Sequence, residues 1–134
     1  SLIFTLFKMR VAKITLCNRS RKNAEILKKL FNDLMIVDWG TIVDFDMIIN
    51  ATSVGLKKND IINLDLSEIG RDKFFYDVIY NPKETDFLRK GKKSKNKTQN
   101  GEKMFIYQAL ASFKIWHGVE PTVDDKVLEI FNND

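Results

Sequence analysis

Short apolar runs alternate along this chain with segments whose apolar residues recur every three or four positions, and this alternation limits the folds open to it. The runs are rich in β-branched and aromatic residues, which predicts strands at 13–18, 34–39, 46–50, 74–80 and 97–99. The other segments predict helices near 1–11, 20–31, 85–93, 102–116 and 122–131, with a weaker helical turn at 64–69. Such alternation favours a parallel sheet with helices on both faces. The sequence therefore predicts an α/β fold with a doubly wound parallel sheet in three layers, α/β/α.

The beginning of the chain does not match the beginning of such a fold. A doubly wound fold normally has a strand and a Gly-rich turn before its first helix, and neither precedes Leu2 in this sequence. The chain also starts at Ser1 without a methionine and enters an apolar run directly. We therefore expect a fragment of a longer protein, with a sheet that lacks its first strand and Gly-rich loop.

Two of the predicted helices carry clear boundary and face signals. Ser20 is a preferred N-cap residue, and the helix after it should bury its apolar side: Ala24, Ile26, Leu27, Leu30 and Phe31. Gly118 should end the long helix, one face of which carries Met104, Gln108, Ala111 and Ile115. In the helix between them, Gly91 is expected to weaken the structure, because glycine disfavours helix interiors.

The stretch from Asp46 to Gly55 points to a ligand. Its first half is a short apolar run, which predicts a strand buried on both faces, and its second half is small, polar and ends in glycine. In open parallel sheets, ligands bind in the crevice outside the carboxyl ends of the strands. Asn50, Thr52 and Ser53 are therefore candidate ligand contacts, although polar loops also follow strands that bind nothing.

Composition and charge narrow the class of protein. The 134 residues are 44% hydrophobic and 30% charged with a formal net charge of +4, which predicts one globular domain. Much of the charge lies in one basic run: Arg89, Lys90, Lys92, Lys93, Lys95 and Lys97. The run has no interleaved aromatic residues on which bases could stack, so a solvated helix face is favoured over a nucleic-acid site.

The single cysteine and single histidine exclude some chemistry. Cys17 cannot form an intrachain disulfide, which fits a reducing compartment, and His117 has no partner for a metal site. His117 instead lies where it can interact with the dipole at a helix C-terminus. The apolar run at 2–7 is too short to span a membrane. We expect a cytoplasmic protein with no metal and no membrane partner.

A basic segment follows the first predicted strand: Asn18, Arg19, Ser20, Arg21 and Lys22. In a dinucleotide-binding fold, the end of the second strand meets the adenosine ribose. An acidic residue there would bind a free 2′-hydroxyl, whereas cations suit a 2′-phosphate. Positive charge at a helix N-terminus opposes the helix dipole, and a bound phosphate would offset that cost. The segment therefore favours NADP over NAD.

Other polar residues are weaker candidates. Tyr80 and Gln108 can both hydrogen-bond a small hydroxylated ligand, but Tyr80 can equally face solvent and Gln108 can equally bond to backbone in the core. Asp77 lies inside a strand run and has no acid or base partner nearby in the sequence. The residues do not assemble a Ser-His-Asp or Cys-His set, so no catalytic residue is predicted.

Four blocks in series resemble the shikimate dehydrogenase family. They are Asn18-Arg19-Ser20; Ile49 to Gly55; Tyr76 to Pro82 with Thr85 and Phe87-Leu88; and Asn100-Gly101 with Met104, Gln108, Ser112-Phe113, Trp116 and Gly118. Their order and spacing both agree with the family over nearly the whole chain. The resemblance implies that residues 1–134 form part of the family's C-terminal, NADP-binding Rossmann domain, beginning just after its Gly-rich phosphate loop.

The resemblance also implies roles by position. Asn18, Arg19 and Ser20 match the segment that grips the 2′-phosphate of NADP. The family often has a further basic residue where this chain has Asn23, a part that Arg21 or Lys22 can take. The loop beside the cofactor is matched by Ala51, Thr52, Ser53 and Val54. Val78 and Gly101 match positions that meet the nicotinamide end through backbone, and Tyr80 and Gln108 match residues that hydrogen-bond shikimate.

The implied reaction is the NADPH-dependent reduction of 3-dehydroshikimate to shikimate, on the chorismate route to aromatic amino acids. The family's catalytic lysine and aspartate lie in an N-terminal domain that this sequence does not contain, so the chain alone is expected to be inactive. A small-molecule substrate is the expected partner, and the oligomeric state stays open. The alternatives are an NAD-using quinate/shikimate dehydrogenase, a non-catalytic nucleotide-binding module, a pseudogene relic, and a nucleic-acid-binding domain acting through the lysine run.

Overall fold

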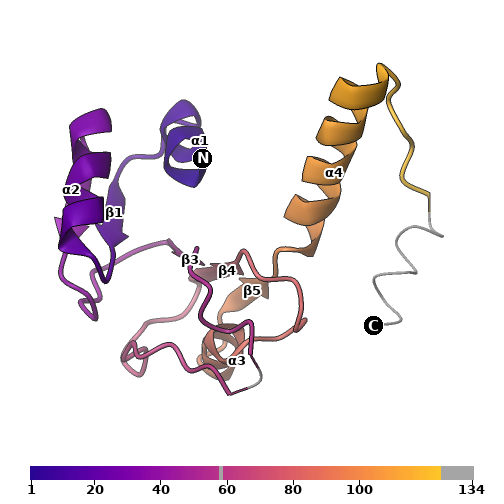
Figure 1. Cartoon of the computed structure of the whole chain (residues 1–134). Helices are drawn as coiled ribbons and strands as arrows, with labels where there is room; N and C mark the ends of the chain where they lie inside the picture. Colours follow the sequence, from indigo (N-terminus) through magenta and orange to yellow (C-terminus); the bar gives the residue numbers. More distant parts are fainter. Residues whose placement is uncertain (58, 125–134) are drawn as a thin grey trace. The chain divides into compact units, whose positions relative to one another are not determined.

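The computed structural model describes residues 1–57 and 59–124, and within them the strands and helices follow one another in the predicted order, with three strands in succession at 34–37, 47–50 and 74–77 (Figure 1). The helices are α1 (Leu2–Lys8), α2 (Arg21–Leu30), α3 (Asp86–Lys93) and α4 (Glu102–His117). The strands are β1 (Ile14–Cys17), β2 (Leu34–Val37), β3 (Met47–Asn50), β4 (Phe74–Asp77) and β5 (Lys97–Gln99). All strand pairs are parallel in the part of the chain that the structure describes, which confirms the α/β class. The helix predicted at 122–131 lies almost wholly outside the described residues.

The chain divides into two compact units. The first comprises Ser1–Val43 and Asn63–Asp65, and the second comprises Asp44–Ile62 and the residues from Leu66 onward. Each unit has its own parallel sheet, with strand order β1-β2 in the first and β3-β4-β5 in the second. In a doubly wound sheet of strand order 3-2-1-4-5-6, β2 and β1 correspond to strands 3 and 2, and β3, β4 and β5 correspond to strands 4, 5 and 6.

The first unit is a βαβ crossover. β1 pairs with β2 from Ile14↔Leu34 to Cys17↔Val37, and α2 connects the two strands. α2 buries only Ala24, whereas Ile26 and Leu30 are 52% and 70% exposed. The prediction that these two side chains are buried is wrong. Helical periodicity identifies the apolar side of α2, but burial also needs a facing surface, and the sheet of this unit is two strands wide.

The second unit contains most of the core. β4 is its central strand, paired with β3 on one side and β5 on the other, and α3 connects β4 to β5. The buried apolar side chains of the unit are Ile62, Leu66, Phe75, Ile79, Phe87, Leu88 and Ile106. Gly91 is buried in α3, and a Cβ built on it would lie 2.7 Å from the ring of Phe75. The glycine that weakens the helix locally is therefore required by the packing of α3 on β4.

One further expectation for this unit is wrong. β3 is not buried on both faces, since Met47 is 41% exposed. The weak helical turn predicted at 64–69, in the long connection from β3 to β4, is observed as a turn at 67–68. Gly118 ends α4 in a left-handed conformation, as predicted, and on the face that carries Met104, Gln108 and Ala111, Ile115 is 80% exposed, whereas Ile106 is the buried residue of the helix. Burial again depends on what an element packs against.

β4 ends at Asp77, although the apolar run predicts a strand to Tyr80. The backbone N–H of Ile79 donates to Oδ1 of Asp77 at 3.0 Å, the pattern of an Asx turn. The side chain of Asp77 thus takes a donor that a longer strand would give to the sheet. Residues 78–81 leave the sheet as a loop, and this loop carries part of the candidate site.

Candidate functional site

In the first unit, the predicted basic segment forms the turn from β1 into α2, and its own side chains hold that turn. Ser20 is the N-cap, as predicted, and its Oγ accepts a hydrogen bond from the N–H of Asn23 at 3.4 Å. The Nδ2 atom of Asn18 donates to the carbonyl oxygen of Ser20 at 2.9 Å. The two polar side chains therefore fix the backbone on which the cations are carried.

The cations of this segment differ in their partners. Arg21 forms ion pairs with Glu25 and Asp38, each at 3.0 Å, so its charge is largely neutralised. Arg19 and Lys22 are exposed and make no ion pair with any residue that the structure describes. Of the three cations in this segment, Arg19 and Lys22 are therefore the ones available to bind an anion.

In the second unit, a pocket of about 370 Å³ lies where β3 and β4 end. Its lining residues are Thr52, Ser53, Leu56, Val78, Ile79, Tyr80 and Asn81. Thr52, Ser53, Val78 and Tyr80 come from two segments of the chain that were predicted separately, and the fold brings them together. Ala51 and Val54 belong to the same loop but do not line the pocket.

The loop that carries Thr52 and Ser53 is built around the side chain of Asn50. The Oδ1 atom of Asn50 accepts from the N–H and the Oγ1 of Thr52, at 3.1 and 2.8 Å, and its Nδ2 donates to the carbonyl oxygen of Val54 at 3.0 Å. The N–H of Val54 in turn donates to Oγ1 of Thr52 at 3.1 Å. Asn50 is only 2% exposed, so its side chain shapes the loop, and the expectation that it contacts a ligand is wrong.

The backbones of Val78 and Gly101 lie against each other. The resemblance implied that both residues meet the nicotinamide end of the cofactor through backbone, and this stays a prediction. The N–H of Gly101 donates to the carbonyl oxygen of Ile79 at 3.0 Å. A Cβ built on Gly101 would lie 2.0 Å from the carbonyl oxygen of Val78. No side chain can occupy that space, so glycine is required where α4 begins against the 78–81 loop.

Tyr80 and Gln108 are placed by α4. The ring of Tyr80 stacks on that of Phe105 in α4, with centroids 4.5 Å apart and planes 26° from parallel. Gln108 is three residues after Phe105 and so lies on the same side of the helix. Both predicted substrate residues are exposed, and Tyr80 has 39% of its surface free.

Comparison with known proteins identifies the family. A family model for the shikimate 5′-dehydrogenase C-terminal domain matches residues 101–125, a range that includes the whole of α4. The shikimate dehydrogenase (NADP(+)) of Pelagibacter ubique is 51% identical over 132 residues, which are 98% of this chain and 50% of that protein. This chain belongs to the shikimate dehydrogenase family. It spans about half the length of the curated relatives it matches.

Solved structures of the family and its neighbours share the fold. Shikimate dehydrogenase from Aquifex aeolicus matches with a TM-score of 0.77 and 35% identity, over 91% of this chain and 45% of that one. Quinate dehydrogenase from Corynebacterium glutamicum, in complex with NAD, matches with a TM-score of 0.81 and 25% identity, over 98% and 50%. The Rossmann-like class is therefore confirmed by the topology and by these neighbours.

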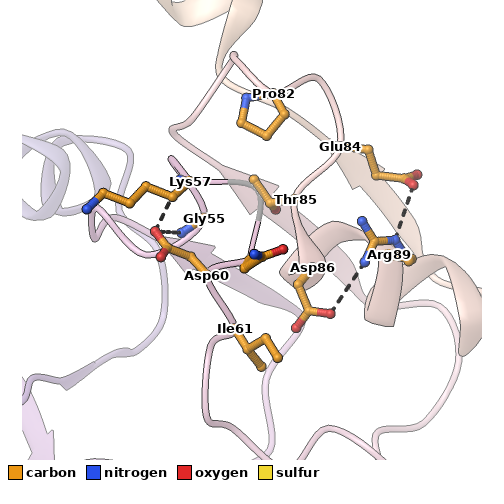
Figure 2. A pocket seen from close by; sticks show the side chains of 10 residues that line it. Gly55, Lys57, Asp60, Ile61, Pro82, Glu84, Thr85, Asp86 and Arg89 are labelled. Atoms are coloured by element: carbon orange, nitrogen blue, oxygen red, sulfur yellow. Dashed lines mark hydrogen bonds and ion pairs between the residues drawn. The ribbon is translucent and has the colours of Figure 1, made fainter.

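This chain has a second pocket, of about 390 Å³, and none of the predicted site residues lines it (Figure 2). Its three carboxylates and its guanidinium have partners: Arg89 lies 3.7 Å from Glu84 and 3.6 Å from Asp86, and Asp60 accepts from the N–H groups of Gly55 and Lys57. A hydrogen bond from Lys92 lowers the pKa of Glu84, against the opposing effect of burial. These interactions join groups that line the second pocket to one another. The pocket at the strand ends, which contains predicted site residues, therefore remains the candidate site.

The sequence also missed residues that build the site. Asp77 and Thr85 are buried, and they hydrogen-bond each other at 2.6 Å although neither was predicted to contribute. The available signal was a carboxylate inside an apolar strand run, which must have buried partners to be tolerated there. Beside Asp77, burial raises the pKa of Tyr76. Among the described residues no cluster of three or more His, Cys, Asp or Glu side chains could hold a metal, and no helix is long and apolar enough to cross a membrane.

Proposed function

We propose that this chain is the NADP-binding part of a shikimate dehydrogenase, corresponding over residues 1–134 to the C-terminal domain of the family. In the first unit, Arg19 and Lys22 bind the adenosine 2′-phosphate, with Asn18 and Ser20 fixing the turn and Arg21 contributing less. In the second unit, the loop at 51–54, Val78 and Gly101 meet the nicotinamide end. Tyr80 and Gln108 hydrogen-bond the substrate. The reaction of the whole protein is the reduction of 3-dehydroshikimate to shikimate with NADPH.

The observation that carries this proposal is that two cations at the end of β1, Arg19 and Lys22, make no ion pair with any described residue. Arg19 and Lys22 lie beside the N-terminus of α2, where positive charge is unfavourable unless an anion is bound. A guanidinium suits a phosphate because it can donate two parallel hydrogen bonds. Gly101 lacks a side chain because the Val78 backbone fills that space, and its packing holds the start of α4 against the 78–81 loop that lines the pocket.

The chemistry fits a division of labour within the longer protein. Bound NADPH supplies the hydride, and the protein must orient it and exchange a proton with the substrate hydroxyl. The residues of this chain that line the pocket offer hydroxyl, amide and backbone groups, which bind and orient. We therefore expect the purified chain to bind the cofactor without reducing substrate. NADPH oxidation in the presence of 3-dehydroshikimate, above a blank without protein, would contradict this.

Titration calorimetry of NADP⁺ and NAD⁺ with the 134-residue chain tests which of the two cofactors the chain binds. Hydrogen bonds between charged groups contribute about 1.5–3 kcal/mol, so Arg19→Ala should weaken NADP⁺ binding about 10- to 100-fold and leave NAD⁺ binding nearly unchanged. Lys28→Ala is the matched control, because Lys28 is an exposed cation in the last turn of the same helix. Equal losses for both cofactors, or an equal loss in the control, would sink the role of Arg19.

The rival functions predict different results in the same experiments. An NAD-using quinate/shikimate dehydrogenase predicts tighter binding of NAD⁺, the ligand in the Corynebacterium glutamicum structure. A non-catalytic nucleotide-binding module predicts cofactor binding by a longer protein that also lacks activity, and a relic without function predicts no thermal stabilisation by either cofactor. A nucleic-acid-binding domain predicts salt-sensitive binding to any duplex. The single cysteine fits a reducing compartment such as the cytoplasm.

A further inference from the structure

The carboxylate of Asp77 lies at the centre of the second unit and is fully buried. Its Oδ1 accepts from the N–H of Ile79 at 3.0 Å and from Nδ2 of Asn50 at 3.2 Å. Its Oδ2 accepts from Oγ1 of Thr85 at 2.6 Å and from the same Nδ2 of Asn50 at 3.1 Å. Groups from three segments, at Asn50, Ile79 and Thr85, therefore donate to one side chain, and every one of these bonds needs Asp77 as an acceptor.

The first of these segments is the Asn50 loop. Asn50 uses its Nδ2 on Asp77 and on the carbonyl oxygen of Val54, and its Oδ1 on Thr52. The orientation of the Asn50 amide is thus set by Asp77, because its nitrogen must face the carboxylate. With the amide held, Thr52 and Ser53 are presented to the pocket at the strand ends. Asp77 therefore reaches the predicted cofactor loop through one intermediate side chain.

The second segment is the loop after β4. The bond from the N–H of Ile79 to Asp77 fixes the backbone on both sides of that amide, including the carbonyl oxygen of Val78. The carbonyl oxygen of Ile79 then accepts from the N–H of Gly101, which begins α4. Val78, which lines the pocket, and Gly101, which is packed on Val78, are therefore tied to the same carboxylate.

The third segment begins α3. The Oγ1 atom of Thr85 donates to Asp77 and also accepts from the N–H of Leu88 at 3.3 Å, so Thr85 is both a partner of Asp77 and the N-cap of the helix. Gly55 closes the Asn50 loop against this point: its φ is +116°, and a Cβ on it would lie 3.1 Å from Cγ2 of Thr85. Both ends of the Asn50 loop are thus anchored on groups that Asp77 holds.

We propose that Asp77 is a positioning residue for the pocket, which sets the geometry of the Thr52–Ser53 loop, of Val78 and of Gly101 at once without touching a ligand. This inference rests on the proposed function only for the identity of the ligand, since the network itself belongs to the fold. Asparagine cannot replace aspartate here. Its NH₂ group would turn toward donors, and at least one of Ile79, Thr85 and Asn50 would lose its acceptor.

Amide hydrogen exchange, read residue by residue by NMR on the full 134-residue chain, tests the proposal. In Asp77→Asn, the amides of Ile79, Thr52 and Val54 should exchange at least about tenfold faster, because buried hydrogen bonds to a charged group are lost. Amides of the β4–β5 ladder, such as that of Phe75, should change much less. Asp46→Asn is the matched control, an exposed carboxylate at the start of β3 that should leave all these rates unchanged.

A uniform rise over the unit, ladder amides included, would mean that Asp77 only stabilises the fold, and this would overturn the proposal, as would unchanged rates at the three amides. If Asp77→Asn does not fold, Thr85→Val removes the bond to Asp77 and the cap bond from Leu88 at similar volume, and it should raise the same three rates several-fold. Thr85→Ser keeps the hydroxyl and should restore the rates of the native chain. Equal rates in Thr85→Val and Thr85→Ser would then contradict the proposal.

Cofactor binding separates this inference from the proposed function. If the native chain binds NADP⁺, Asp77→Asn should weaken NADP⁺ and NAD⁺ equally, about tenfold or more, because the shared nicotinamide end loses its preformed site. Arg19→Ala should instead discriminate between the two. If the native chain binds neither cofactor, the proposed function fails, and the exchange rates still decide the role of Asp77. Unchanged binding of both cofactors in Asp77→Asn would overturn the positioning role.

Discussion

The two units of this chain build their predicted binding segments in opposite ways. In the first unit, residues 18–22 hold their turn with neighbours two or three residues away, and their cations are exposed. In the second unit, the pocket loops depend on Asp77 and on a glycine, both buried and both in contact with remote segments. Changes in the first segment should therefore alter ligand choice at little cost in stability, and changes in the second should alter stability first.

The largest effect is expected for Gly101→Ala. The added Cβ would lie 2.0 Å from the carbonyl oxygen of Val78, so the backbone has to shift, and we expect the free energy of unfolding to fall by about 3 kcal/mol. Urea unfolding measures this. Gly70→Ala is the control, because nothing lies within 4 Å of a Cβ there, and its change should stay within about 0.5 kcal/mol. Similar stabilities for the two variants would show that the close packing of Gly101 on Val78 does not contribute to the stability of the second unit.

Gly91→Ala should have a smaller effect of the same kind. Alanine favours a helix by about 1 kcal/mol, but its Cβ would lie 2.7 Å from the buried ring of Phe75, and overpacking costs about 1–3 kcal/mol. We expect a net loss of about 1 kcal/mol in urea unfolding. With Phe75→Leu already in place, the same substitution should become neutral or stabilising, since the ring is gone. A gain in stability for Gly91→Ala alone would show that α3 adjusts freely on β4.

Ser20→Ala probes the first unit. The cap hydrogen bond to Asn23 is long, at 3.4 Å, so its loss should cost about 0.5–1 kcal/mol. The exchange of amides in the first turn of α2 should quicken while those of the second unit stay unchanged, because the bond is local. Ser53→Ala, at an exposed serine of the pocket, serves as the control and should be neutral. Faster exchange in the second unit as well would mean that the units are not independent in stability.

The smallest effect concerns pH. A hydrogen bond from Lys92 lowers the pKa of Glu84 from its ordinary value of 4.5, so this pair contributes stability above that value and loses it as the pH falls through the lowered pKa. Because the carboxylate is 39% exposed, the contribution should stay below about 0.5 kcal/mol. Lys92→Ala should raise the pKa of Glu84 in an NMR titration. An unchanged pKa would show that Lys92 is not the cause.

The sequence by itself determined what depends on near neighbours. Strand and helix order, the cap at Ser20, the end of α4 at Gly118 and the basic segment at 18–22 all rest on groups within a few residues of one another. The resemblance implied that Thr52, Val78 and Tyr80 belong to one site; all three line the same pocket, and their contact with a ligand stays a prediction. The local features need no knowledge of which segments touch, whereas this site does.

Only the tertiary structure decided which residues are buried and why. Asp77 hydrogen-bonds with Asn50, 27 residues upstream, and with Thr85, 8 residues downstream, and the residue pattern of the strand predicts neither partner. Ile26, Leu30 and Ile115 carry the helical periodicity of a core, yet they are exposed because no described residue of their own units covers them. Gly91 and Gly101 look like local defects and are instead points of close packing. The periodicity of apolar residues belongs to a single helix or strand. Burial depends on two elements that pack together, and only the fold determines which element is the second.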